Sequence, residues 1–235
     1  MVNWEKAGRP ARAARAALSY DAIATAGIEV ADGQGFDAVT MRKVADHLGA
    51  GAMSLYRYVD SRDDLLDLMA DRVSAEAIAP PRTGDWRADL TRAAHILRDV
   101  TLRHPWLTRH AITAGGFGPN TVTMTESTLT LLDGYGLDID EMLDVWRTLV
   151  AFVQGYASAE AQRLEAHRRR AEQPAADGDE TGPSYLDTVA ASGRYPLASR
   201  ALLGPKRPVD PQQTFDRRLG YLLDGLAHTF FAGPR

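Results

Sequence analysis

Few side chains in this sequence are of the types that carry out covalent chemistry. Its 235 residues include no cysteine, which excludes disulfide bonds, thiolate metal sites and a nucleophilic thiol. There is no G-x-S-x-G nucleophile turn, no phosphate-binding glycine loop and no H-E-x-x-H zinc motif. His104 and His110 are separated by six positions and a proline, which is not a recognised ligand spacing. We therefore expect neither an enzyme nor a bound metal or other cofactor.

Charge is unevenly distributed, although the net charge is only −4. The arm over residues 1–17 has one acid, Glu5, against four basic residues: Lys6, Arg9, Arg12 and Arg15. Acidic residues gather later, as in Asp138–Glu141. A basic end ahead of a neutral-to-acidic body is typical of a DNA-binding region joined to a domain with another task. For the arm itself, insertion into a DNA minor groove and a solvated tail without a partner are the two interpretations.

The composition is that of an ordinary globular protein, with 45% hydrophobic and 25% charged residues. The first residues are polar and lack the apolar core of a signal peptide. No stretch approaches the roughly 18 uninterrupted apolar residues of a membrane span. We expect a cytoplasmic protein without a membrane partner.

The elements that must position the remaining polar side chains are helices. Ser19 is suited to cap a helix through Ala31, which the glycines that follow bring to an end. Thr40 caps a short helix, and Gly49 supplies the left-handed backbone that ends it. A second short helix is predicted over residues 52–58. Two short helices joined by a tight turn that contains glycine are the helix-turn-helix arrangement.

A longer helix begins after Ser61, and Pro80–Gly84 then breaks the chain, so we place a domain boundary there. Apolar spacing predicts further helices over residues 86–103, 106–112, about 119–132, 139–170, 184–191 and from 211 onward. Residues 171–183 are polar, contain Gly and Pro, and indicate a mobile insertion. No strand pattern occurs. The sequence predicts an all-α chain with a helix-turn-helix domain over 18–79 and a larger helical domain over 84–235.

Residues 18–73 contain an ordered series of motifs, VTMRKVADHLG at 39–49, LYRYV at 55–59 and RDDLL at 62–66. With these motifs the segment resembles the TetR family of transcriptional regulators. The region from Gly84 onward contains Asp85-Trp86-Arg87, His104-Pro105-Trp106 and an apolar stripe over Phe215–Leu226. On these residues it is similar, more weakly, to the C-terminal domain of the tetracycline-repressor branch. The resemblance implies a three-helix DNA-binding domain followed by a larger helical domain for ligand binding and dimerisation.

The helix-turn-helix supplies the candidate DNA contacts. Thr40 and Arg42 open its first helix, where a hydroxyl, a guanidinium and backbone N–H groups can meet a phosphate. The exposed face of the second helix is expected to reach base edges in the major groove through Ala52, Met53, Ser54, Arg57 and Tyr58. Because that helix begins with small residues, Arg57 is the expected main base reader, for guanine. The resemblance implies phosphate contacts for Tyr56 and Arg62.

A homodimer is expected, because one short recognition helix reads too few base pairs for specificity. Two copies would read half-sites about 34–36 Å apart or a multiple of that distance. The resemblance pairs the helices that begin at Ile139 and Pro211 with their symmetry mates in a four-helix bundle. Small residues between Gly155 and Ala161 permit close approach. A purely intramolecular role for both helices is the alternative.

The larger domain also carries aromatic and polar residues suited to a small-molecule cavity. The candidates are His104, Trp106, His110, Phe117, Met124, Trp146, Phe152 and Gln154. For each aromatic residue, a place in the apolar core is the alternative. The metal-assisted ligand capture of the tetracycline-repressor branch is not carried over, because the metal-ligand spacing is absent.

The resemblance implies a ligand-responsive repressor that binds a palindromic operator as a homodimer and is released by a small-molecule effector. Ligand binding would displace the helix over 61–73, which carries the DNA-reading elements, and so change operator affinity. Two alternatives stay open. The regulator could activate transcription, or a TetR-like scaffold could bind another protein instead of DNA.

Overall fold

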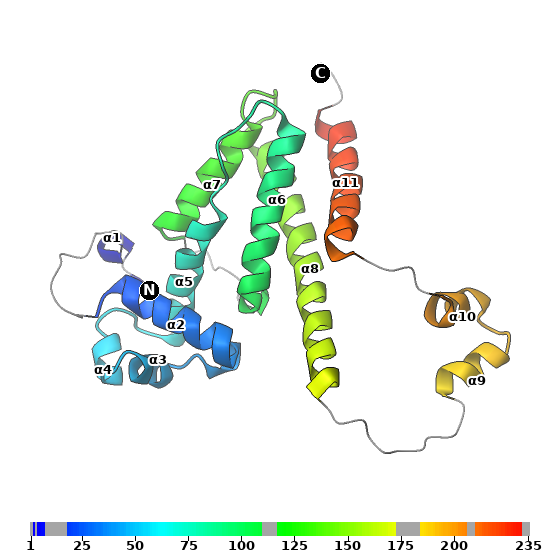
Figure 1. The fold of residues 1–235 in the computed structure, drawn as a ribbon. Helices are drawn as coiled ribbons and strands as arrows, with labels where there is room; N and C mark the ends of the chain where they lie inside the picture. The colour runs from blue at the N-terminus through cyan, green and yellow to red at the C-terminus, as the bar shows by residue number, and fades with distance from the viewer. Residues whose placement is uncertain are drawn as a thin grey trace.

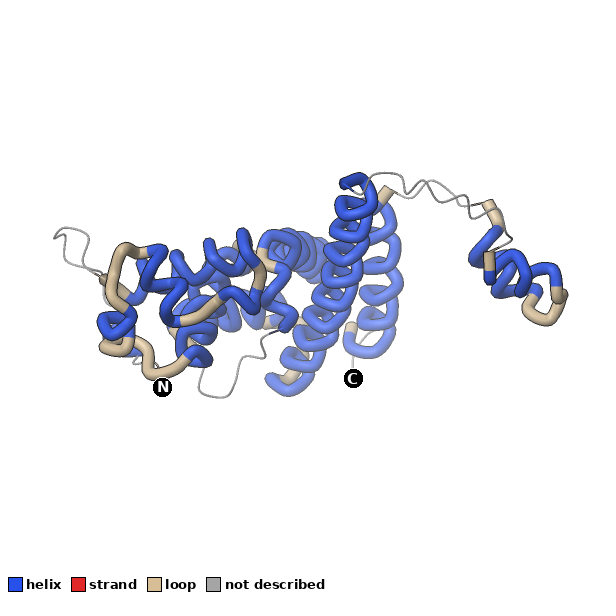
Figure 2. Tube along the Cα trace, turned by 90° about the horizontal axis from the view of Figure 1, so that it is seen from below, coloured by secondary structure: helices blue, strands red, loops and turns tan. Residues whose placement is uncertain are grey.

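The chain folds into a set of packed helices (Figure 1). The structure is a computed structural model, and it describes residues 2, 4–7, 18–109, 117–172, 184–205 and 210–231. Within these ranges there are helices, 3-10 turns and loops but no strand, as Figure 2 shows. The prediction of an all-α fold is confirmed.

Capped helices form the N-terminal part of the molecule. They are α1 (Trp4–Ala7), α2 (Tyr20–Gln34), α3 (Met41–His47), α4 (Ala52–Leu55) and α5 (Arg62–Ser74). The hydroxyls of Ser19, Thr40 and Ser61 accept backbone N–H bonds at 3.0, 3.1 and 3.1 Å at the starts of α2, α3 and α5. Gly49 has a φ of +63° after α3, so the turn uses backbone that favours glycine. The three predicted caps and this turn are confirmed.

Helix α4 is shorter than the sequence predicts. It covers Ala52–Leu55, and residues 56–58 form a turn instead of continuing to Tyr58. Its N-cap, Gly51, has no side chain to accept the first N–H groups, which weakens a helix that is already near the minimum length. The hydroxyl of Tyr58 donates to the carbonyl of Leu18 at 2.5 Å. That bond draws residue 58 towards the start of α2.

A small apolar core packs helices α2, α3, α4 and α5 together. It is built from fully buried side chains on each helix: Ile23, Val30, Val44, Leu55, Leu65 and Met69. Gly27 of α2 makes room for α5, because a Cβ atom at this position would lie 2.6 Å from the Met69 sulfur. Leu55 is the one fully buried residue of α4, and Val59 is buried after the turn that follows.

Longer helices form the larger domain. They are α6 (Trp86–Arg103), α7 (Pro119–Leu132), α8 (Ile139–Glu172) and α11 (Pro211–Phe230), and the 3-10 turn η3 (Pro105–Arg109) follows α6. Helices α6 and α8 pack along each other and α11 packs on α8. A buried ion pair ties α6 to α8, with Arg98 donating to both carboxylate oxygens of Glu160 at 2.9 and 2.7 Å. Figure 1 shows α5 running between this bundle and α2–α4.

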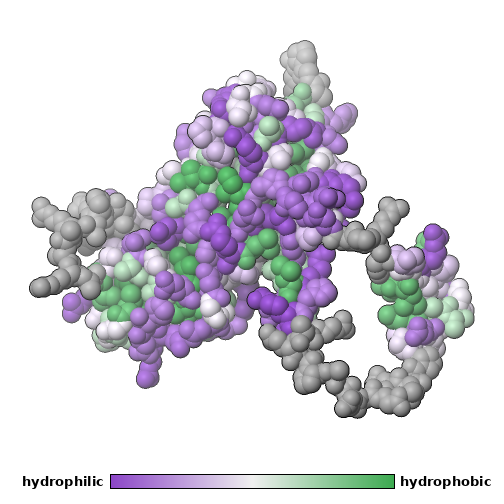
Figure 3. Space-filling model, viewed as in Figure 1, coloured by the Kyte–Doolittle hydropathy of each residue, from purple (hydrophilic) through white to green (hydrophobic). Residues whose placement is uncertain are grey.

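Two short helices, α9 (Tyr185–Ala191) and α10 (Pro196–Leu203), pack on each other and stand apart from the bundle in Figures 1 and 2. The sequence predicted the first and missed the second. Figure 3 shows apolar surface on this pair, where Tyr185 and Leu197 are strongly exposed. Residues 171 and 172, predicted to open the mobile insertion, belong to α8, and residues 173–183 lie outside the described part. No helix in the described ranges is long and apolar enough to span a membrane.

Candidate DNA interface and effector cavity

Helices α3 and α4 present an exposed polar surface at the end of the molecule. Met53 is 78% exposed, and Arg57 and Tyr56 are also exposed. Ala52 and Ser54 are half-buried beside them. These positions come together because Leu55 and Val59 face the core and turn the intervening residues outward.

Thr40 and Arg42 lie at the start of α3. The Thr40 hydroxyl accepts the Lys43 N–H at 3.1 Å, so it acts as a helix cap and keeps its own proton available to donate. The Arg42 side chain is exposed and lies 3.9 Å from Asp46, one turn along. Such a weak surface pair leaves the guanidinium available for another anion.

Tyr58 and Arg62 differ from the sequence expectation. Tyr58, expected on the exposed face, is half-buried, bonds Leu18 and packs edge-on against Tyr20. Arg62 donates to the carbonyls of Val39 at 2.7 Å and Phe36 at 3.0 Å. Tyr58 therefore holds the backbone before α2, and Arg62 holds the backbone before α3.

A first joint between the N-terminal helices and the larger domain lies at α5 and α7. The Asp71 carboxylate, in a residue 3% exposed, accepts hydrogen bonds from Thr121 N, Thr121 Oγ1 and Asn120 Nδ2 at 2.8, 3.0 and 2.9 Å. Gly118 lies against it, and a Cβ atom there would come within 2.4 Å of Asp71 Cγ. This joint, the Asp71 joint, is tightly packed and its donors are all uncharged.

A second joint, the Asp32/Asp37 joint, connects α2 and the 3-10 turn η1 (Phe36–Ala38) to η3. Asp32 lies 2.8 Å from Nδ1 of His104 and accepts the Trp106 indole N–H at 2.8 Å. Asp37 accepts two bonds from Arg109, at 3.1 and 3.0 Å. His104 and Trp106, predicted to bind a ligand, therefore contact Asp32.

The pKa of His104 is shifted at this joint. Burial is the largest influence on its pKa and lowers it, but the hydrogen bond and charge of Asp32, with the charge of Glu76, outweigh burial. The pKa of His104 is consequently raised above its usual value of 6.5. The protonated ring is the form that fits between two carboxylates.

A cavity of about 510 Å³ lies between α5, α6, η3, α7 and α8. It is lined by Ala70, Val73, Ser74, Ala77, Leu97, Val100, Thr101, Leu107, Thr108, Arg109, Met124, Trp146, Val150 and Gln154. The size and the mix of apolar walls with a few polar groups suit a small organic molecule. Three of the predicted ligand residues, Met124, Trp146 and Gln154, line it.

The other predicted ligand residues lie elsewhere. Phe152 packs against Tyr156 and Phe215 between α8 and α11. Phe117 is 56% exposed and is not among the lining residues, and His110 lies outside the described residues. Within the described part, no cluster of three or more His, Cys, Asp or Glu is placed to hold a metal ion.

Comparison with known proteins identifies the chain. Residues 23–69 match the family described as "Bacterial regulatory proteins, tetR family", and residues 79–230 match "Tetracyclin repressor-like, C-terminal domain". The chain belongs to the TetR family. It is therefore a transcriptional regulator with a helix-turn-helix DNA-binding domain.

Individual TetR-family relatives extend over most of the chain. The HTH-type transcriptional repressor DrrR1 of Streptomyces coeruleorubidus is 36% identical over 196 residues, which cover 83% of this chain and 72% of that protein. An HTH-type transcriptional regulator of Saccharopolyspora erythraea is 33% identical and covers 90% and 86%. ActR of Streptomyces coelicolor, solved in complex with (S)-DNPA, superposes with a TM-score of 0.70 at 30% identity and covers 90% and 98%.

Sequence reasoning missed several residues that line the cavity. The cavity wall from α5, with Ala70, Val73 and Ser74, was assigned to the DNA-binding domain alone. Arg109 was not singled out, although it lies one residue before the predicted candidate His110. The available signal was the charge of Arg109 on a short segment otherwise rich in apolar residues.

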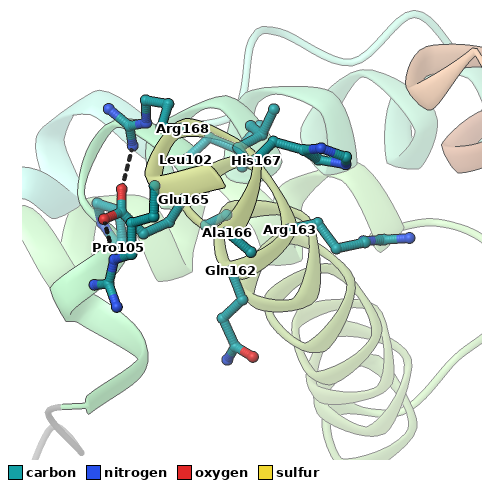
Figure 4. Close-up of a pocket in the computed structure, with 11 residues that line it drawn as sticks. Leu102, Pro105, Gln162, Arg163, Glu165, Ala166, His167 and Arg168 are labelled. Carbon is teal, nitrogen blue, oxygen red and sulfur yellow. Dashed lines mark hydrogen bonds and ion pairs between the residues drawn. The ribbon is translucent and has the colours of Figure 1, made fainter. Parts of the chain in front are cut away.

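A second hollow differs in character from the cavity beside α5. This open groove of about 900 Å³ lies beside Leu102, Pro105 and the C-terminal half of α8 (Figure 4). Glu165 pairs there with Arg168 and Arg169, at 2.9 Å each. Its α8 wall is largely exposed and charged, so it lacks the enclosure of the cavity beside α5.

Proposed function

We propose that this TetR-family regulator is a repressor that binds a palindromic operator as a homodimer and is released by a small molecule held in the cavity beside α5. The observation that carries the proposal is the double role of α5. Leu65 and Leu66 of α5 lie in the core under the reading helices, whereas Val73 and Ser74 line the cavity. A ligand that moves α5 must therefore move α3 and α4.

In this proposal the exposed surface of α3 and α4 enters the major groove. Arg57 reads guanine, while Ala52, Met53 and Ser54 approach neighbouring bases. Thr40, Arg42 and Tyr56 contact phosphates. Tyr58 and Arg62 act as positioning residues, because their polar atoms bond Leu18, Phe36 and Val39.

The homodimer is proposed to form through α8 and α11. Ala151, Gly155 and Ala159 lie four positions apart on α8 and are all exposed. This stripe of small residues would let a second copy approach closely. Tyr221 on α11 is 66% exposed and would add apolar area to the proposed interface. A two-fold axis here would place two reading surfaces on one side of a duplex.

The test is selection of duplex DNA from a random library by the purified full-length protein, with its mass in solution measured by light scattering. A dimer should enrich an inverted repeat. Arg57→Ala should lower discrimination between the selected and random duplexes by about 10-fold. Arg42→Ala should weaken both complexes equally and lower the slope of log affinity against log salt by about 1.

Arg168→Ala is the matched control. Arg168 is an exposed arginine on α8, outside the surface of α3 and α4, so its loss should leave both affinities unchanged. A monomer that enriches no duplex at low ionic strength would contradict the proposal and would favour the scaffold alternative.

A further inference from the structure

The cavity beside α5 holds one charged side chain among its described lining residues. That side chain is Arg109, at the end of η3. Ser74, Thr101, Thr108 and Gln154 are the other polar residues of the lining, and all are uncharged. The lining therefore combines one charged residue with largely apolar walls.

Arg109 also contacts the DNA-binding domain. It binds the Asp37 carboxylate with two parallel hydrogen bonds, and its guanidinium lies 4.8 Å from the centre of the Phe36 ring. The guanidinium of Arg62 lies at the same distance from that ring. One arginine thus touches both the cavity and the 3-10 turn η1.

The turn η1 leads directly into the helix-turn-helix. Arg62 of α5 bonds the carbonyls of Phe36 and Val39, and Thr40 caps α3 in the next position. A displacement of η1 therefore changes the position of α3 relative to α5. Asp37 is the point at which Arg109 holds this turn.

The Arg109–Asp37 pair is easily exchanged. The Asp37 side chain is 81% exposed and that of Arg109 is 54% exposed. An exposed ion pair of this kind shifts an equilibrium by at most about fivefold. The apolar body of a ligand in the cavity would cover part of Arg109 and reduce its contact with water. A carboxylate on that ligand would then meet the guanidinium in less water than Asp37 does, and the charge pair would be stronger. Asp37, when released, would be hydrated at little cost.

We propose that the effector carries a carboxylate that binds Arg109 and displaces Asp37, so that effector binding directly removes one of the contacts holding the DNA-binding domain. The inference rests on the proposed function of the cavity. A carboxylate is favoured among anions because Arg109 already binds one with two parallel hydrogen bonds. Trp146 and Met124 in the wall fit a flat aromatic body.

Matched acid and amide probes test this directly. The probes are naphthalene-2-carboxylate and anthracene-2-carboxylate, each paired with its neutral carboxamide of nearly the same shape. Their binding to the free full-length protein is measured by fluorescence and calorimetry. At least one acid should bind about 10-fold or more tightly than its amide, because the acid adds charge-assisted hydrogen bonds. The same acid, but not the amide, should weaken the complex with the selected duplex.

Variants at both partners locate the effect. Arg109→Gln should reduce the ratio of acid affinity to amide affinity below about twofold. Arg109→Lys should restore part of this ratio, since lysine keeps the charge but cannot form the two parallel hydrogen bonds. Asp37→Asn should keep the preference for the acid and strengthen acid binding by up to about fivefold. Arg72→Gln is the matched control, because Arg72 pairs with exposed Asp21 at 2.9 Å and does not line the cavity. The ratio of acid affinity to amide affinity in Arg72→Gln should equal that of the wild type.

The possible failures are distinguishable. If no duplex is enriched, the repressor function fails while the probe measurements on free protein still report on Arg109. If the duplex is bound but acids bind no better than amides, or if Arg109→Gln keeps the preference, the inference is overturned and the repressor function stands. Absence of binding by both acids at about 1 mM also overturns it.

Discussion

The two joints that hold the DNA-binding domain differ in kind. At the Asp71 joint, a buried carboxylate binds three uncharged donors, and Gly118 leaves no space for even one more carbon atom. The Asp32/Asp37 joint uses a histidine, an indole and an arginine, and its Arg109–Asp37 pair is exposed to water. The first joint is built to be rigid, whereas the second includes an exposed ion pair that water or a ligand can replace.

This difference indicates where the molecule can move. Breaking the Asp71 contacts would leave buried donors without partners, which costs about 1–3 kcal/mol for each group. Releasing Asp37 from Arg109 costs less than about 1 kcal/mol. Any rotation of the DNA-binding domain should therefore keep the α5–α7 contact as its pivot and open the contact between η1 and η3.

The largest expected effect comes from Asp71→Ala. Removing the carboxylate leaves the Thr121 and Asn120 donors without an acceptor, so the free energy of unfolding should fall by about 3 kcal/mol. Urea denaturation followed by circular dichroism measures it. Asp37→Ala is the control from the other joint and should cost less than about 1 kcal/mol. Equal losses in the two variants would remove the distinction between the joints.

A smaller loss is expected for Gly118→Ala. The added methyl group would overlap Asp71 and the ring of Trp4, whose nearest atom would lie 2.5 Å away. Overpacking of this kind costs about 1–3 kcal/mol. The backbone of Gly118 has a φ of −83°, so no backbone strain contributes. Thermal unfolding checks this, and an unchanged melting temperature would show that the α5–α7 joint is looser than described.

The smallest effect concerns pH at the Asp32/Asp37 joint. Because the pKa of His104 is raised in the folded protein, the stabilisation it provides is complete below about pH 6.5, the unfolded value, and is lost as the pH rises through the folded value. The stability advantage of the wild type over His104→Gln should therefore shrink between pH 6 and pH 9, and denaturant titrations across that range measure it. An advantage that grows with pH would mean that the buried ring is neutral.

The sequence predicted those features that depend on neighbouring residues. Ser19, Thr40 and Ser61 cap helices because each cap needs only the next three residues, and Gly49 ends α3 for the same local reason. The roles of Tyr58 and Arg62 depend on carbonyls more than 20 positions away. Such contacts leave no periodic signal in the sequence.

The cavity was predictable only in part, for a similar reason. Met124, Trp146 and Gln154 lie on helices already assigned to the larger domain, so their place in the lining followed from the domain division. Val73 and Ser74 sit on α5, which that division placed wholly in the DNA-binding domain. Phe152 has the same apolar character as Trp146, but its direction on α8 takes it to Phe215 instead.

Helix α4 is only one turn long and is held mainly by Leu55, and this has an evolutionary consequence. Side chains such as Met53 and Arg57 project into solvent and contribute little to stability. They can be exchanged without endangering the fold. With the proposed role of these side chains in reading bases, operator preference would drift by single substitutions, while the remainder of the chain stays under selection for its own packing.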